Sequence, residues 1–341
     1  MARIVKGRSL VAVISRRAAL GGLLTLPALS RARATALRDP SWPSALVMGT
    51  GQPGGDYTIF GPAWGTLATQ ASGVSMVYQA SGGATSDILL IEQNAAQLGM
   101  TTLSIASQAW SGSASWTGGA NLRGFRALFP MYVSTVQIIA PHNKALIRAA
   151  DLQGAVIGVG PQGSSAASIL PRALAALGIV PAGFRAGGYI EQINQMSAGD
   201  LTACAFVGAT PVPAIVSAAR LAGFNLIGFN DQQAALMIKA VPGLMAAIIP
   251  QNSLPGQSAA VATIGTGNIA IGRADLPAGL VSALTLAAMK HRAALDRVIP
   301  GNGLIQPAQL LEGDSQIMLH EGAVQALQSL GITVPDRLTK S

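Results

Sequence analysis

Residues 48–57 read MGTGQPGGDY and raise the first question about this chain. Four glycines, at positions 49, 51, 54 and 55, come directly after the short apolar run of residues 45–48, and a helical pattern follows. A strand, a glycine-rich turn and a helix start are typical of an anion site, because unpaired backbone N–H groups converge there. The stretch therefore predicts a turn that holds a dinucleotide, a nucleoside triphosphate or a small organic acid.

The two nucleotide motifs are incomplete in this chain. Gly49-x-Gly51-x-x-Gly54 matches the dinucleotide pattern, but no acidic residue follows at the end of the next expected strand, residues 77–80. A phosphate-binding loop needs Lys and then Ser or Thr after its last glycine, where this chain has Asp56 and Tyr57. A carboxylate there would repel a phosphate. We therefore expect neither a nucleotide nor another cofactor.

Strand-like and helix-like segments alternate from residue 45 onward, and the glycine-rich turn recurs at residues 158–165. Further strands are expected at residues 74–79, 97–101, 133–140, 155–159, 202–207 and 224–228, and helices at residues 86–94, 164–178 and 276–294. The alternation predicts an α/β fold with largely parallel strands. The repeated unit predicts two α/β lobes, with a ligand cleft between them at the carboxyl ends of the strands.

The basic charge of the chain is concentrated at its N-terminus. The formal net charge is +8, and residues 1–34 hold seven basic residues and no acidic one. Taking these seven from the 22 basic residues leaves 15, against 14 acidic residues. The remainder therefore has no basic cluster from which to build a nucleic-acid-binding face, and we expect no nucleic-acid partner.

The first 34 residues have the order of an export signal. A basic segment precedes the apolar residues 18–26, and Ala32-Arg33-Ala34 forms a small-x-small cleavage site. Ser15-Arg16-Arg17 resembles the twin-arginine signal of bacteria. An uncleaved membrane anchor is the alternative. The remaining protein is expected to be periplasmic.

The sequence contains no recognisable catalytic motif. It lacks the metal-binding spacings H-E-x-x-H and C-x-x-C and the G-x-S-x-G nucleophile elbow. Cys204, the one cysteine, lies in a strand-like segment and is expected to be a core residue, while His320 is expected to be structural. Binding through backbone N–H groups is the remaining interpretation. An exported enzyme that uses Asp56 as a base is the alternative from another class.

Several motifs occur in order along the chain. They are Gly49-Thr50-Gly51, Gly54-Gly55-x-Tyr57, Ser81-Gly82-Gly83, Leu98-Gly99, residues 122–129 (LRGFRALF), Asp151-Leu152-x-Gly154, Gly160-Pro161-x-Gly163-Ser164, Gly208-x-x-Pro211 and residues 319–323 (LHEGA). Together they resemble the TAXI family of TRAP transporter solute-binding receptors. The resemblance implies a type II periplasmic-binding-protein fold. Its lobe 1 would comprise residues 35–138 and 247–341, and its lobe 2 residues 139–246, joined by crossing strands near residues 136–140 and 246–249.

The resemblance also implies a function. Receptors of this kind capture a small organic anion such as a dicarboxylate, glutamate or 2-oxoglutarate by hinge closure and deliver it to membrane subunits driven by an ion gradient. Such a receptor is not an enzyme and is expected to be a monomer. The alternative is the solute-binding component of an ATP-driven importer, or a sensor.

The candidate ligand-binding residues lie in the turns and at the first residues of the helices. They are Thr50, Gly51, Gly54, Gly55, Asp56, Tyr57, Ser81, Gly82, Gly83, Thr101, Thr102, Pro161, Gly163, Ser164, Ser165, Ala209 and Pro211. Asp56 departs from the family pattern, in which Thr is common. Its carboxylate is expected to face solvent, or else to pair with a ligand amine. Phe60 and Trp64 recur at helical spacing with Tyr57 and are expected to be core residues.

Overall fold

The computed structural model describes residues 38–220, 223–299, 305–306 and 316–339. The predicted export signal lies outside these residues. None of the helices within them has the length and apolar character needed to cross a membrane. The described residues, from position 38 onward, belong to one compact unit.

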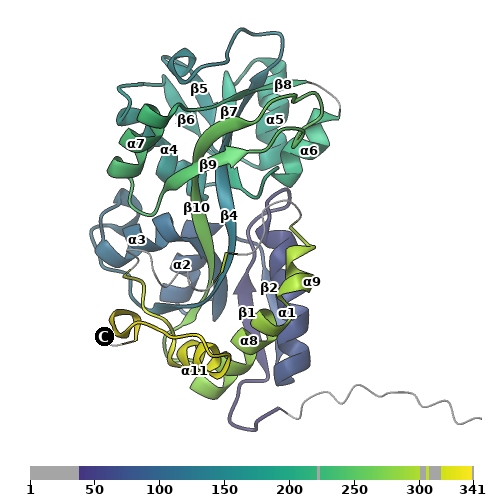
Figure 1. The fold of residues 1–341 in the computed structure, drawn as a ribbon, viewed down its shortest axis with the longest axis vertical. Helices are drawn as coiled ribbons and strands as arrows, with labels where there is room; N and C mark the ends of the chain where they lie inside the picture. Colours follow the sequence, from purple (N-terminus) through teal and green to yellow (C-terminus); the bar gives the residue numbers. More distant parts are fainter. Residues whose placement is uncertain (1–37, 221–222, 300–304, 307–315, 340–341) are drawn as a thin grey trace, which may run out of the picture. The chain divides into compact units, whose positions relative to one another are not determined.

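The strands of this unit form one ten-stranded sheet (Figure 1). They are β1 (Ala45–Gly49), β2 (Ser75–Gln79), β3 (Leu98–Thr102), β4 (Phe125–Pro141), β5 (Val156–Gly158), β6 (Gly183–Arg185), β7 (Ala203–Gly208), β8 (Phe224–Ile227), β9 (Met245–Ile249) and β10 (Val261–Arg273). The order is β2-β1-β3-β10-β4-β7-β5-β6, with β8 on β4 and β9 on β10. β1 is parallel to β2 and β3, and β5 is parallel to β6 and β7. The predicted α/β class is confirmed. The prediction of largely parallel strands is wrong for the sheet as a whole, because β4 and β10 pair antiparallel with each of their neighbours.

Two long antiparallel strands, β4 and β10, join the halves, and Figure 1 shows them side by side. The predicted strand at residues 133–140 is only the second half of β4, which begins at Phe125 and continues through Pro130. Pro130 obscured this continuity because proline usually ends a strand, and the pairing is irregular there. The expected return strand at residues 246–249 is β9, which pairs with β10 alone. The expectation that residues 246–249 form the second linking strand was therefore wrong. β10 is that strand, because it pairs with β3 and also with β4 and β9. The lobe boundaries stay a prediction.

Ten helices are described around the sheet. They are α1 (Tyr57–Ser72), α2 (Ala84–Glu92), α3 (Leu103–Ser111), α4 (Ser165–Ala175), α5 (Tyr189–Ala198), α6 (Pro213–Ala219), α7 (Asp231–Ala240), α8 (Ala278–Lys290), α9 (Arg292–Asp296) and α11 (Glu321–Ser329), with short 3-10 turns at Ser115–Thr117, Ala149–Leu152 and Asp336–Leu338. The helix expected at residues 276–294 is divided at His291, whose backbone is not helical. Ser164 caps α4 as predicted, whereas α4 ends at Ala175, before Gly178.

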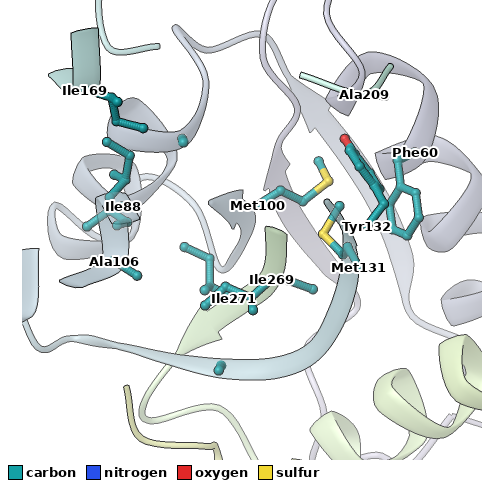
Figure 2. Close-up of a cluster of buried hydrophobic side chains, with 14 of the residues drawn as sticks. Phe60, Ile88, Met100, Ala106, Met131, Tyr132, Ile169, Ala209, Ile269 and Ile271 are labelled. Carbon is teal, nitrogen blue, oxygen red and sulfur yellow. The ribbon is translucent and has the colours of Figure 1, made fainter. Parts of the chain in front are cut away.

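The core beneath the first glycine-rich turn fixes the position of α1. Phe60 and Trp64 are fully buried, as their spacing predicts. The Trp64 ring meets Phe129 of β4 edge-on at 5.0 Å, and the Phe60 ring lies 5.7 Å from Tyr132 of the same strand (Figure 2). These contacts hold the first residues of α1 beside the middle of β4. Cys204 and His320 are also buried, as expected.

Candidate ligand-binding site

Asp56 lies at the N-cap position of α1 but does not cap that helix with its side chain. Its Oδ2 instead accepts a hydrogen bond of 2.5 Å from the backbone N–H of Ala209, which follows β7 in the other half of the chain. The residue is only 6% exposed. The expectation that Asp56 faces solvent was therefore wrong, because a segment 153 positions away covers it.

The surroundings of Asp56 are aromatic and lack a basic group. Oδ1 of Asp56 is buried without a hydrogen-bond partner among the described residues. Burial raises the pKa of the carboxyl to about 7, against the lowering effects of the Ala209 N–H and the Tyr132 hydroxyl. Figure 2 shows the Tyr132 ring beside Phe60, with its hydroxyl oxygen directed towards the segment of Ala209. At neutral pH this acid is therefore close to half ionised.

The turn that carries Ala209 is held by β4. The Gln137 amide donates to the carbonyl of Ala209 at 2.7 Å, and its oxygen accepts the N–H of Val212 at 3.0 Å. The hydroxyls of Thr135 and Thr210 lie 2.7 Å apart. These bonds fix the backbone of the turn, so the N–H of Ala209 points at Asp56 rather than into open space.

A second contact joins the glycine-rich turn of residues 158–165 to the Ser81-Gly82-Gly83 turn and the start of α2. The carbonyl of Gly163 accepts the N–H groups of Thr85 and Ser86, at 3.0 and 3.4 Å, at the first turn of α2. A Cβ atom on Gly82 would lie 1.9 Å from the carbonyl oxygen of Gln162, so only glycine permits this approach. The sequence predicts a ligand-binding turn at Ser81-Gly82-Gly83, directly before these amides. They are instead occupied by the chain's own carbonyl.

A buried hydrogen-bond network holds the glycine-rich turn of residues 49–55 in place. The Ser81 hydroxyl accepts the N–H groups of Gly51 and Gly83, at 2.9 and 3.2 Å, and donates to Asp87 at 2.5 Å. The other Asp87 oxygen accepts the N–H of Met100 at 3.0 Å. Burial raises the pKa of this carboxyl also to about 7. Ser81 and Asp87 thus position the turn.

The first turn of α4 remains available. The Ser164 hydroxyl accepts the N–H of Ala167 and donates to the carbonyl of Val159, which caps the helix. Ser165 is 6% exposed and lines the cavity described below. The N–H groups of Ser165 and Ala166 precede the first possible helical acceptor, so the helix itself leaves them unpaired.

These elements surround a cavity of about 30 Å³, lined by Gly51, Gln52, Gly55, Asp56, Tyr57, Gly83, Ala84, Thr102, Ser134, Ser164, Ser165, Tyr189, Val207 and Asn268. Eight predicted site residues are among them: Gly51, Gly55, Asp56, Tyr57, Gly83, Thr102, Ser164 and Ser165. The other nine, Thr50, Gly54, Ser81, Gly82, Thr101, Pro161, Gly163, Ala209 and Pro211, do not line it. Several of these position the wall instead: the Gly54 carbonyl, for example, accepts the N–H of Ala214.

Six lining residues were not identified from the sequence: Gln52, Ala84, Ser134, Tyr189, Val207 and Asn268. Gln52 and Ala84 lie within or next to predicted motifs and could have been included. Asn268 has no local signal. It accepts a 2.7 Å hydrogen bond from the Tyr57 hydroxyl and donates to Ser134, so it is recognised as part of the wall only once β10 is placed beside β4.

The described residues contain no group of three or more His, Cys, Asp or Glu side chains that could hold a metal ion. The 14 lining residues include no Lys or Arg, and Asp56 is the single side chain among them that is ionisable near neutral pH. Hydroxyls, backbone N–H groups and one carboxylate can bind a small polar molecule. The arrangement contains no Ser or Cys beside a histidine base.

Comparison with solved structures shows the same fold class. A structure described as that of a periplasmic transporter matches with a TM-score of 0.51 at 14% identity, covering 86% of this chain and 97% of that chain. The GluR0 ligand-binding core of Nostoc punctiforme, in complex with L-glutamate, matches with a TM-score of 0.45 at 16% identity, covering 74% and 96%. The periplasmic aliphatic sulphonate binding protein SsuA of Escherichia coli matches with a TM-score of 0.42 at 13% identity, covering 88% and 92%.

A protein-family model gives the assignment that these distant likenesses do not. The model of the NMT1-like family matches residues 48–331, from the first glycine-rich turn to the end of α11. The match therefore includes every lining residue of the cavity. This chain belongs to the NMT1-like family.

Proposed function

We propose that the protein is a periplasmic solute-binding receptor that captures a small polar solute and delivers it to membrane subunits of an importer. The observation that carries the proposal is the cavity itself. Both glycine-rich turns and residues of both halves of the sheet line it. The Asp56–Ala209 and Gly163–α2 contacts enclose it, and both cross between segments far apart in sequence. Contacts of this kind suit a cleft that closes over a ligand and reopens.

The importer class is part of the proposal. The family match is to the NMT1-like family, whereas the TRAP-linked TAXI family rests on the sequence resemblance alone. We therefore favour the alternative stated from the sequence, the solute-binding component of an ATP-driven importer.

The ligand expected from the resemblance, a dicarboxylate or 2-oxoglutarate, fits the cavity poorly. A dianion would have no Lys or Arg side chain among the lining residues and would lie beside Asp56. Like charges at such short range in a buried site are strongly unfavourable. We propose a ligand with at most one anionic group.

An enzyme that uses Asp56 as a base is less well supported. The carboxyl has a pKa suited to proton transfer, but Oδ2 is engaged by the Ala209 N–H and no second catalytic group lines the cavity. Reversible binding of a solute needs only the hydroxyls, backbone N–H groups and carboxylate that line the cavity.

A thermal-shift screen of the purified protein tests the receptor proposal. The panel contains dicarboxylates, keto acids, amino acids, amines, aliphatic monocarboxylates and alkanesulfonates, with NAD and ATP as controls. A ligand at 100 times its dissociation constant stabilises the folded state by about 2.7 kcal/mol, which raises the melting temperature by several degrees. A shift with at least one small solute is expected. Shifts with nucleotides alone, or with nothing, would contradict the proposal.

A further inference from the structure

We propose that the cavity selects a small zwitterion, with the cationic nitrogen against Asp56 and the anionic group at the first turn of α4. This inference rests on the receptor function proposed above and specifies the solute. It excludes the dicarboxylates and 2-oxoglutarate that the sequence resemblance implies, and it develops the pairing of Asp56 with a ligand amine. It is carried by two independent features at the wall of one cavity, an unpaired buried carboxylate oxygen and an unoccupied helix N-terminus.

The cationic end is defined by Asp56. Its Oδ1 accepts no hydrogen bond of normal length from the described residues, and the Tyr132 hydroxyl that influences this carboxyl is itself left without a partner. Asp56 is more than nine-tenths buried while lining the cavity. A buried polar atom of this kind is costly unless a partner arrives. Tyr57 and Tyr189 also line the cavity, so aromatic rings lie close to the same carboxylate. An ammonium group would satisfy Oδ1 and find favourable ring faces beside it.

The anionic end is defined by α4, a helix of 11 residues. Its N-terminus carries a partial positive charge and the unpaired amides of Ser165 and Ala166. The Ser165 hydroxyl is a second donor there, is more than nine-tenths buried, and lines the cavity. At the first turn of α2 the amides of Thr85 and Ser86 are already bound by the Gly163 carbonyl. The first turn of α4 is therefore the better-equipped position for a carboxylate.

The cavity size limits the distance between the two charges. A volume of about 30 Å³ has room for roughly two or three water positions. A solute that carries its two charges a short distance apart, as an α-amino acid does, suits this volume. A longer side chain would need the Asp56–Ala209 and Gly163–α2 contacts to open.

The inference has a pH consequence. The titratable groups that face Asp56 are Tyr57 of α1, Tyr132 of β4 and Tyr189 of α5, and none of them is cationic. Burial raises the pKa of Asp56 to about 7, and only the ionised form can pair with an ammonium. Affinity for a zwitterion should therefore fall about tenfold between pH 8 and pH 6. Affinity for a neutral or purely anionic solute should not fall in this way.

Titration calorimetry with a matched panel tests the inference. The probes are glycine, L-alanine and glycine betaine as zwitterions, propionate as the deaminated acid, ethylamine as the decarboxylated amine, and succinate. At pH 8 at least one zwitterion should bind, and propionate, ethylamine and succinate should bind at least tenfold more weakly. The Asp56→Asn variant keeps an oxygen that can accept the Ala209 N–H, and should lose at least tenfold in affinity for the zwitterion. Asp231→Asn, at an exposed position in α7, should bind like wild type.

The outcomes separate this inference from the receptor function. Tighter binding of propionate, ethylamine or succinate than of any zwitterion overturns the inference and leaves the receptor function standing. A zwitterion affinity that is equal at pH 8 and pH 6 in the wild type also overturns it, and this readout does not depend on the folding of any variant. No binding to this panel together with no shift in the thermal screen overturns both.

Discussion

The contact of the Ser81-Gly82-Gly83 turn with the glycine-rich turn of residues 158–165 makes the sharpest prediction. A methyl group introduced by Gly82→Ala would lie 1.9 Å from the Gln162 carbonyl oxygen, where ordinary contact begins near 3.4 Å. The Gln162 carbonyl and the turn that carries it must therefore move about 1.5 Å away from residue 82. Such a shift breaks the two hydrogen bonds from α2 to Gly163, now 3.0 and 3.4 Å long. Because Gly82 does not have a positive φ, the effect is steric and not a matter of backbone strain.

The magnitude follows from those two bonds. Each contributes about 0.5–1.5 kcal/mol net, so closure becomes less favourable by about 1–3 kcal/mol. If ligand binding requires closure, the dissociation constant rises by about 5- to 150-fold. The melting temperature of the ligand-free protein should change little, since the clash is relieved when the cleft opens.

The assay is calorimetric titration of wild type and variant with the tightest-binding solute of the thermal-shift panel. Gly183→Ala in β6 is the matched control, because a Cβ atom there meets nothing within 4 Å and the residue does not have a positive φ. It should bind like wild type. A wild-type dissociation constant for Gly82→Ala would refute the reasoning, since it would show that the turns do not approach when the ligand is bound.

Three further predictions concern the support of the cavity and the buried thiol. Ser81→Ala leaves the N–H groups of Gly51 and Gly83 without their acceptor and should destabilise the fold by about 2–4 kcal/mol, measured by urea unfolding; a loss below 0.5 kcal/mol would contradict this. The raised pKa of Asp87 means that the folded state binds more protons than the unfolded state between about pH 4 and pH 7. The free energy of unfolding should therefore fall as pH rises through that window, and less steeply in Asp87→Asn; equal slopes would count against it. Burial raises the pKa of the Cys204 thiol to about 12, so iodoacetamide at pH 8 should label it only after unfolding.

The local features of this protein could be predicted from its sequence. The glycine-rich turns, the Ser164 cap and the buried face of Phe60 and Trp64 each depend on residues within a few positions of one another. The strand–helix alternation follows for the same reason. β4 is the exception among these local features. Pro130 lies in its middle, and the sequence pattern therefore predicted only the part of the strand at residues 133–140.

The environment of the candidate site could not be predicted in this way. Asp56 is a plausible solvent-facing residue until Ala209 is placed over it, and its raised pKa has the same distant origin. The α2 amides look free until Gly163 docks on them. Tyr189 and Asn268 carry no motif at all, and reach the cavity only through the pairing of β4 and β10 and the position of α5. These properties depend on the fold rather than on local sequence.

Equilibrium dialysis with an isotopically labelled solute, taken from the thermal-shift panel, tests the central claim most directly. The receptor account predicts that the protein retains one solute molecule per chain at saturation, and that the retained compound is recovered chemically unchanged after prolonged incubation. Conversion of the solute into another compound, or the absence of saturable retention, would contradict it.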